Sequence, residues 1–269
     1  MRRSNGRVLR GLGLLALTLV LLLAGPLFML AGPRIDLGSH WASADRSSAG
    51  LAPLPERTPE AVIQIYAARA FNWRGAFGVH TWIATKPAGA SSYRVHQVTR
   101  WSYSASTQRS APDRAWFGNS PWLLADYRGA AAARMIPLIN DAAAAYPLAG
   151  RYRVWPGPNS NTFVAWVVRQ VPGLRVQLPA LAVGKDYLID GPFAAAPSGS
   201  GYQFAVGGVI GILVALEEGI ELNLLGLTLG VDFTKPALKL PGIGRVGFPQ
   251  SVMGTVMTQE GRVLQTPAQ

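Results

Sequence analysis

Residues 9–31 read LRGLGLLALTLVLLLAGPLFMLA, and this stretch decides how the whole chain is organised. From Gly11 onward it contains about 21 uncharged, mainly apolar residues, and a helix of that length, about 30 Å, crosses the hydrocarbon core of a bilayer. Four arginines, at Arg2, Arg3, Arg7 and Arg10, precede the uncharged run that begins at Gly11. Because positively charged flanks stay in the cytoplasm, we expect a single-pass protein of a bacterial inner membrane. Its N-terminus would be cytoplasmic, and everything from Pro33 onward would be periplasmic or otherwise outside the cytoplasm.

A cleaved signal peptide is the competing interpretation of the same stretch. Small residues at Ala24-Gly25 and Ala31-Gly32 offer cleavage sites. The apolar run is longer than the 7–15 residues usual for a signal peptide, however. The length therefore favours an uncleaved anchor, with the lipid bilayer as the first partner of the chain.

The charge and composition of the chain indicate which classes of molecule it can bind. The formal net charge is +11, with 49% hydrophobic and 14% charged residues. Beyond the N-terminal flank the basic residues are scattered, whereas a nucleic-acid-binding protein clusters them, so we expect no nucleic acid. Anionic lipid headgroups or a polyanionic wall polymer suit the charge better. The chain has no cysteine, which excludes disulfides, thiolate metal sites and a cysteine nucleophile.

The chain divides into four predicted parts. They are the cytoplasmic flank and anchor (1–32), a linker (33–60), an exported globular domain (61–250) and a flexible tail (251–269). The linker is rich in Pro, Ser, Gly and Ala and shows no hydrophobic period, which is typical of connecting segments. The third part is long enough to bury one substantial core. The oligomeric state stays open.

The first half of the exported domain shows alternating strands and amphipathic helices. Strands are predicted over 61–67, 79–85, 92–99 and 101–107, with 79–99 forming a hairpin. An Ala-rich stretch, 130–146, contains Pro137 and predicts one kinked helix or two short ones. Residues 159–171 have the apolar spacing and N-terminal caps of a buried helix. These elements predict an α+β fold, with the N-terminal transmembrane helix followed by one domain of an antiparallel sheet and a few packed helices.

The last third of the domain allows two interpretations. Residues 202–216 are apolar and Gly-rich, Glu217, Glu218 and Glu221 follow, and 222–233 alternate between apolar and other residues. Alternation favours strands that form a hairpin on the core or against the lipid surface. A second membrane-embedded segment is the alternative, although carboxylates are rare inside a membrane. We expect Glu217 and Glu221 to lie in a solvated turn.

Three residues could support chemistry. His80 and His96 fall on the two strands of the predicted hairpin, where they can share a face, and Ser160 lies at the start of the 159–171 helix. A helix N-terminus favours developing negative charge, and acyl transfer needs a nucleophile, a base and an orienting group. A helix N-cap for Ser160 and hydrogen-bonded strand positions for the two histidines are the structural alternatives. The histidines and glutamates lack a recognisable ligand spacing, so no metal and no cofactor are predicted.

These residues resemble a known arrangement. Asn159-Ser160-Asn161-Thr162-Phe163-Val164 is similar to the Asn-Cys-x-x-Phe-Val setting of the circularly permuted papain-like hydrolases, which include the lecithin-retinol acyltransferase-like enzymes, with Ser in place of Cys. The resemblance covers residues 61–171. It implies a permuted papain-like fold, with Ser160 as nucleophile, His80 as base and His96 as the residue that orients it. The replacement of cysteine by serine matters for the mechanism. A serine hydroxyl must lose its proton to a base as it attacks, whereas a cysteine thiolate forms readily.

The chain also resembles a bacterial family of unknown function, numbered 3750. The stretches that carry this resemblance are GVHTW, GPNSNTFVAW, LEEGIELNLLGLTLGVDF and ALKLPGIGRVGF. This second resemblance implies no activity.

Two functions follow as hypotheses. One is a membrane-anchored amidase, esterase or acyltransferase that acts on cell-wall peptides or lipids. Its mechanism would be that of a serine hydrolase or acyltransferase. The other is a catalytically inactive module of the cell envelope that binds a ligand or has a structural role. In the second case a groove for sugars or acyl chains could be lined by tryptophans, at Trp73, Trp82, Trp101, Trp116 and Trp122.

Overall fold

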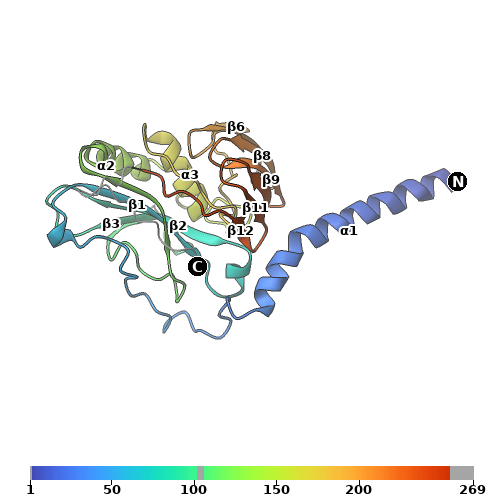
Figure 1. Ribbon diagram of the computed structural model, residues 1–269, viewed down its shortest axis with the longest axis horizontal. Coiled ribbons are helices and arrows are strands. Elements are labelled where there is room, and N and C mark those ends of the chain that lie inside the picture. Colours follow the sequence, from blue (N-terminus) through green and yellow to red (C-terminus); the bar gives the residue numbers. More distant parts are fainter. Residues whose placement is uncertain (1, 102–105, 255–269) are drawn as a thin grey trace.

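The structure is a computed structural model that describes residues 2–101 and 106–254 (Figure 1). Its first half is built on a five-stranded antiparallel sheet with the order β4-β3-β2-β1-β5. The strands are β1 (Val62–Arg69), β2 (Val79–Lys86), β3 (Arg94–Gln97), β4 (Ser106–Arg109) and β5 (Trp122–Arg128). Two short 3-10 helices, η1 (Pro55–Arg57) and η2 (Asn72–Ala76), flank β1. The predicted hairpin of residues 79–99 is confirmed, because β2 pairs with β3 antiparallel.

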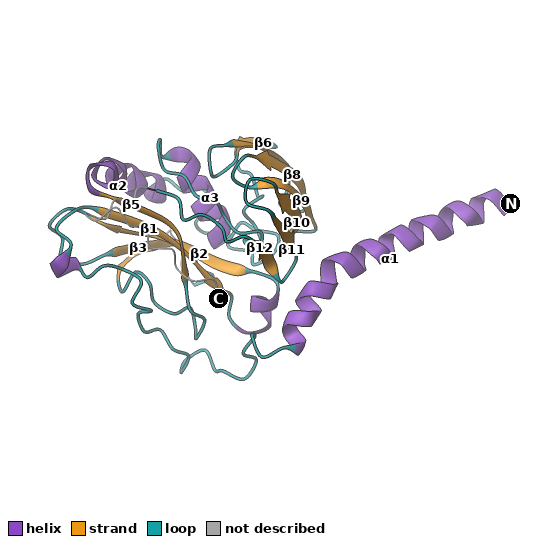
Figure 2. Ribbon diagram, in the orientation of Figure 1, coloured by secondary structure: helices purple, strands orange, loops and turns teal. Residues whose placement is uncertain are grey.

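Helices cover one face of this first sheet. Helix α2 (Gly129–Ala144) follows β5 directly and runs through Pro137 as a single helix. Helix α3 (Ser160–Gln170) packs across β2 and contacts α2. Figure 2 shows both helices above the sheet, with α3 next to the second half of the domain. Buried apolar side chains from β1, β2, β5, α2 and α3 form the main core, which includes Ile63, Ile83 and Phe163.

The second half of the domain is a seven-stranded antiparallel meander with the order β12-β11-β10-β9-β8-β7-β6. The strands are β6 (Phe193–Ala195), β7 (Gly201–Val206), β8 (Ile210–Ala215), β9 (Gly219–Leu224), β10 (Leu227–Asp232), β11 (Ala237–Leu240) and β12 (Gly244–Gly247). Residues 202–233 thus form strands, as alternation indicated. Tight turns connect them, and Gly207, Gly208 and Gly226 take the positive φ angles that such turns require.

One long helix precedes the domain. Helix α1 (Arg2–Ala31) contains one stretch, Leu9–Ala31, that is apolar and long enough to cross a membrane. Its second half is not free: Leu22, Gly25, Pro26 and Met29 are buried against the domain. Their spacing of i, i+3, i+4 and i+7 places them on one helix face.

The contact between α1 and the domain is close. A side chain at Gly25 would overlap the backbone of Pro241, and one at Gly242 would overlap the backbone of Pro26. Met29 also joins Ile35 and Ala76 in a small apolar cluster. The β11–β12 turn therefore receives α1 with backbone against backbone.

The segment predicted as a linker runs along the domain and is bound to it. The carboxylate of Asp113 accepts hydrogen bonds from the hydroxyl of Ser48 (2.8 Å) and from the backbone N–H groups of Leu51 (2.6 Å) and Ala52 (3.1 Å). At the other end of the chain, Met253 lies within the predicted tail and pairs with β5. Residues 255–269 of that tail lie outside the described residues.

The expected α+β class, with an N-terminal apolar helix, antiparallel pairing and few helices, is confirmed. There are two sheets instead of one, and β5, β6, β11 and β12 were not predicted. The fourth predicted strand lies later in the chain, since Trp101 precedes β4 and residues 102–105 are outside the described part. No finding confirms the permuted papain-like arrangement.

Candidate functional site

His80 is a buried, uncharged histidine. Its ring stacks on Trp116, with centroids 3.6 Å apart and an interplanar angle of 7°. Its Nε2 lies 2.9 Å from Oε1 of Gln97, so the ring N–H donates to the amide oxygen. Burial lowers the pKa of His80 to about 3. An imidazole with so low a pKa is a weak base, poorly matched to proton abstraction near neutral pH.

His96 points to the other side of the sheet. It lies directly opposite Ile83 in the β2–β3 pairing, and its Nε2 is 3.0 Å from Oγ1 of Thr85. Side chains alternate along a strand, so Thr85 and Ile83 face away from His80. The expectation that His80 and His96 share a face is therefore wrong, because the register of the hairpin offsets them by an odd number of residues. Burial lowers the pKa of His96 to about 4, with Arg94 adding to the effect.

The start of α3 is held by asparagines. Asn159, not Ser160, is the N-cap: its Oδ1 accepts from the N–H groups of Asn161 (2.9 Å) and Thr162 (3.3 Å). The Thr162 hydroxyl accepts from the Asn159 N–H in return, which completes a capping box. The amide groups of Asn159 and Asn161 both donate to the carbonyl of Val183 (2.9 and 2.7 Å). The motif thus ties the helix to the loop before Gly184.

Ser160 occupies the first turn of α3 and is 2% exposed. Its side chain shares a hydrogen bond with the Tyr152 phenol, whose pKa is raised by burial. The backbone carbonyl of Ser160 accepts from Thr81, which lies on the β2 face opposite to His80. Ser160 and His80 are therefore on opposite sides of the sheet. The structure brings His80 to Gln97 and Ser160 to Tyr152, and it does not bring the three predicted residues together.

The five tryptophans do not form one groove. Trp82 is buried in a second apolar cluster with Tyr66, and Trp116 packs against that cluster. Trp122 packs against the main core on the other face of the same sheet. Trp73 and Trp101 are 50% and 73% exposed. Core packing accounts for the first three.

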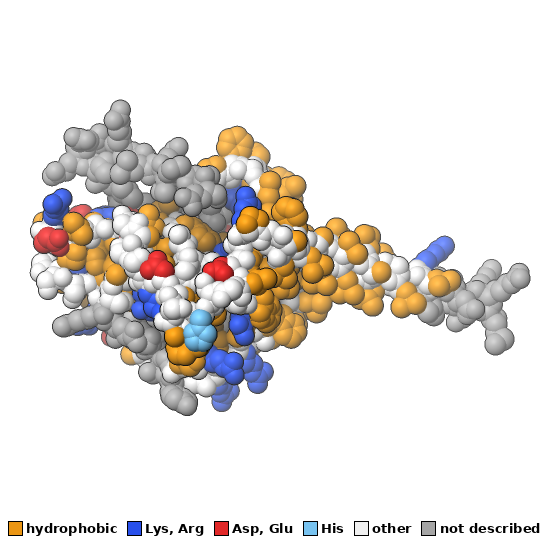
Figure 3. All heavy atoms as spheres, turned by 90° about the horizontal axis from the view of Figure 1, so that it is seen from below, with side chains coloured by type: hydrophobic (Ala, Val, Ile, Leu, Met, Phe, Trp, Pro, Cys, Tyr) orange, Lys and Arg blue, Asp and Glu red, His pale blue; other side chains and the backbone are white. Residues whose placement is uncertain are grey.

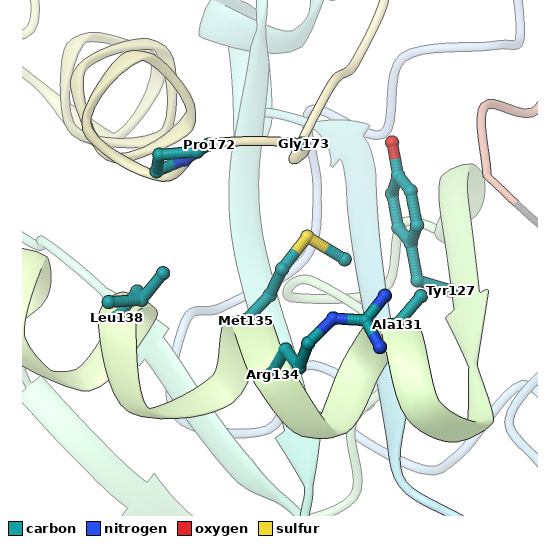
Figure 4. Close-up of a pocket in the computed structure, with 7 residues that line it drawn as sticks. All are labelled: Tyr127, Ala131, Arg134, Met135, Leu138, Pro172 and Gly173. Atoms are coloured by element: carbon teal, nitrogen blue, oxygen red, sulfur yellow. The ribbon is translucent and has the colours of Figure 1, made fainter.

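A pocket of about 410 Å³ lies between α2 and the turn after α3 (Figure 4). It is lined by side chains and backbone of mixed character, from Tyr127, Ala131, Arg134, Met135, Leu138, Pro172 and Gly173. The Tyr127 hydroxyl is already engaged, because it donates to the carbonyl and accepts from the N–H of Arg175 (both 2.9 Å). None of the predicted catalytic residues lines this hollow.

The largest group of charged residues that sequence reasoning missed lies beneath the second sheet. Lys185 Nζ contacts Glu221 Oε2 (2.7 Å) and Asp186 Oδ1 (3.1 Å), and Lys239 Nζ contacts Glu221 Oε1 (2.5 Å). Asn223 donates to Asp186 (2.8 Å). All five side chains are buried. The expectation of a solvated turn is wrong for Glu221, because β9 turns it inward, while Glu217 does lie in the β8–β9 turn.

Electrostatics keep Lys185 and Glu221 ionised. Burial opposes the charge of Lys185, but the carboxylates of Asp186 and Glu221 outweigh it and raise its pKa. Burial likewise opposes the charge of Glu221, and the two lysines outweigh it and lower its pKa. Each charge has an opposite partner, so the group is a structural clamp. The alternation of Ile220-Glu221-Leu222-Asn223 was the available signal, since it places Glu221 and Asn223 on one face.

Among the described residues, no three His, Asp or Glu side chains are arranged to hold a metal ion.

Comparison with known proteins gives one match. Residues 60–187 match the family model described as a protein of unknown function (DUF3750). No curated protein and no solved structure matches the chain. The matched region spans the first sheet, α2, α3 and the loop to Lys185 and Asp186, and it ends before the second sheet. It contains the GVHTW and GPNSNTFVAW stretches, whereas the two C-terminal stretches lie beyond it. Over residues 60–187, the chain is therefore similar to the DUF3750 family of proteins of unknown function.

Proposed function

We propose that this protein is a single-pass membrane protein of the bacterial cell envelope, with a cytoplasmic N-terminus. Its exported domain acts as a non-catalytic binding or structural module held at the bilayer surface. The observation that carries this proposal is the close packing of α1 on the β11–β12 turn, at Gly25 and Gly242. Because α1 packs this closely against the domain, it supports an anchor that is not cleaved from the mature protein.

Cleavage would damage the fold at this contact. Cutting at Ala24-Gly25 removes Leu22, which is 1% exposed, and cutting at Ala31-Gly32 also removes Met29, which is 2% exposed. The second cut uncovers Ile35 and Ala76, the apolar partners of Met29. Uncovering buried apolar area is unfavourable by about 25 cal/mol per Å². A disposable signal sequence has no need of such partners.

The non-catalytic part of the proposal rests on the separation of Ser160 from His80. A serine nucleophile needs a base within hydrogen-bond reach, and here the two side chains occupy opposite faces of the first sheet. The catalytic roles of Ser160, His80 and His96 stay a prediction that lacks geometric support. Trp82 and Trp116 beside His80 supply packing for that ring.

The anchor is tested by mass and topology. The protein purified from membranes is expected to have the full mass of residues 1–269 and to stay in the membrane pellet at high salt. A reporter that works only outside the cytoplasm, fused after Gln269, should be active, and a cytoplasmic reporter at the same site should be silent. A mature chain that begins at Gly25 or Gly32 would refute the anchor, and the reverse pair of reporter signals would refute the orientation.

The second test uses a fluorophosphonate probe, which labels activated serines without a known substrate. The wild-type chain is expected to stay unlabelled at Ser160, because His80, the predicted base, lies on the other face of the first sheet. Ser160→Ala is the matched control, since it removes only the hydroxyl. Labelling of the wild type that disappears in Ser160→Ala would restore the hydrolase hypothesis.

A further inference from the structure

The second sheet has an outward face made of apolar side chains. One cross-strand row runs over six strands and consists of Tyr202, Val214, Ile220, Val231, Leu238 and Val246. The neighbouring row consists of Phe193, Phe204, Ile212, Leu222 and Leu229. All six residues of the first row are between 37% and 78% exposed. Contiguous apolar surface on this scale marks an interaction site.

The inward face of the same sheet buries polar and charged side chains beside a small apolar cluster at Leu213 and Ala215. The register pairs Leu213 with Glu221 and Lys239 with Arg245, and these side chains alternate with the apolar rows. Gln203, Glu221 and Lys239 are each no more than 3% exposed. An antiparallel sheet with one wet face ordinarily turns its apolar side inward. In this sheet the apolar rows face outward and the charged side chains face inward. That arrangement is expected when the outer face meets an apolar medium.

The length of α1 shows which medium lies nearby. Of the apolar stretch Leu9–Ala31, only the part before Leu22 is clear of the domain. About 13 residues at 1.5 Å each give about 20 Å, which is shorter than a hydrocarbon core of about 30 Å. The lipid must therefore extend beside the docked half of α1, where Leu27 and Phe28 are 60% and 67% exposed. The domain surface at that level is the β11–β12 turn, the edge of the second sheet.

The apolar face and α1 are continuous. In Figure 1, α1 leaves the domain on the side where the second sheet lies. Figure 3 shows hydrophobic side chains on the part of the domain next to α1 and along the helix itself. The two apolar surfaces meet where Gly25 packs on Pro241.

We propose that the outward face of the second sheet lies on the bilayer as a second membrane contact, with its two apolar rows at the boundary between headgroups and acyl chains. The proposal rests on α1 as a membrane anchor and goes beyond it, because an anchor alone does not require the outward face of the sheet to touch lipid. Tyr202 and Phe193 stand at one end of the rows, and aromatic side chains favour that boundary.

The absence of cysteine from the chain permits a direct test. Single cysteines are placed in the full chain at Val214 on the sheet face, at Leu19 on α1 and at Leu138 on α2. These side chains are 52%, 40% and 42% exposed. Each is spin-labelled and reconstituted in vesicles of phosphatidylethanolamine and phosphatidylglycerol. Collisions with oxygen, which concentrates in lipid, are compared with collisions with a water-soluble nickel chelate.

We expect oxygen to dominate at Val214→Cys and at Leu19→Cys, and the nickel chelate to dominate at Leu138→Cys. Nickel dominating at Val214→Cys while oxygen dominates at Leu19→Cys would overturn the second contact and leave the anchor intact. A label at Val214→Cys that neither reagent reaches, with spin–spin broadening, would overturn it in favour of a second copy of the chain. Nickel dominating at Leu19→Cys would overturn the anchor, and the second contact with it.

Discussion

The two sheets follow the same alternation of side chains but turn opposite faces toward the protein. The first sheet has an apolar cluster on each face, one beneath α2 and α3 around Ile63 and one around Tyr66 and Trp82. The second sheet buries Glu221 and Lys239 and exposes Ile220 and Leu238. Alternation therefore identifies a strand without saying which face is the inside. The surroundings decide that, and we propose that for the second sheet they include the bilayer.

The polar interior of the second sheet also fixes how its strands align. A shift of β9 by one residue would turn Glu221 outward, leaving Lys239 as a buried, unpaired cation and Lys185 with Asp186 alone. Such a charge is far more costly than a misplaced apolar side chain. We infer that the ion pairs specify the register, while the apolar cores stabilise the first sheet.

The largest effect should come from breaking this network. Glu221→Gln keeps the size of the side chain but leaves buried Lys239 without a carboxylate and Lys185 with Asp186 alone. Loss of one partner of a buried ion pair destabilises by about 3–5 kcal/mol. Glu217→Gln, in the adjacent turn, is the matched control and should change stability by less than about 0.5 kcal/mol. The free energy of unfolding is measured by denaturant titration in detergent, followed by tryptophan fluorescence.

Equal stability of Glu221→Gln and Glu217→Gln would show that the second sheet does not depend on its buried charges. A quadruple variant sharpens the comparison by removing every charge of this network, with Lys185→Met, Asp186→Asn, Glu221→Leu and Lys239→Met. We expect it to recover most of the stability that Glu221→Gln loses, since replacing a whole buried ion pair by apolar residues is often neutral.

A smaller effect is expected on the first sheet, through pH. His80 and His96 have folded pKa values of about 3 and 4, below the value of 6.5 that applies when they are unfolded. Between these values the unfolded chain binds more protons, so stability falls as the pH drops below 6.5. From pH 7 to pH 5 the loss is about 2 kcal/mol per histidine. Denaturant titrations at several pH values measure it.

The control for this pH dependence is the third histidine. His80→Gln should reduce the loss between pH 7 and pH 5 by about half. His40→Gln should leave it unchanged, because His40 is exposed. If His80→Gln leaves the pH dependence unchanged, the buried neutral histidine is not its source.

Local patterns predicted the local elements. The β-branched and aromatic stretch of residues 79–85 predicted β2, the apolar spacing after Asn159 predicted α3, and alternation predicted strands over 202–233. The residue pairing was harder to predict, since a hairpin over 79–99 leaves its register open. That register sends His96 opposite Ile83 and away from His80. The contact of Ser160 with Thr81, which puts Ser160 on the side of β2 away from His80, was equally beyond the local pattern.

Contacts between residues far apart in the sequence could not be predicted from local patterns. Glu221 and Lys185 lie far apart in sequence and meet only when the meander packs on the loop after α3. Likewise, no feature of residues 9–31 indicates that Gly25 contacts Pro241. Sequence gave the membrane-spanning length of α1, and the structure adds that half of this length is also a packing surface.

That packing surface has a mechanical consequence. Because Gly25 packs on the backbone of Pro241 and Gly242 on that of Pro26, the helix and the domain are joined rigidly at this contact. A helix tilts to match the thickness of the bilayer around it, and a domain fixed to the helix must rotate by the same angle. If α1 spans the bilayer as we propose, lipid chain length thereby sets the angle at which the domain stands on the membrane.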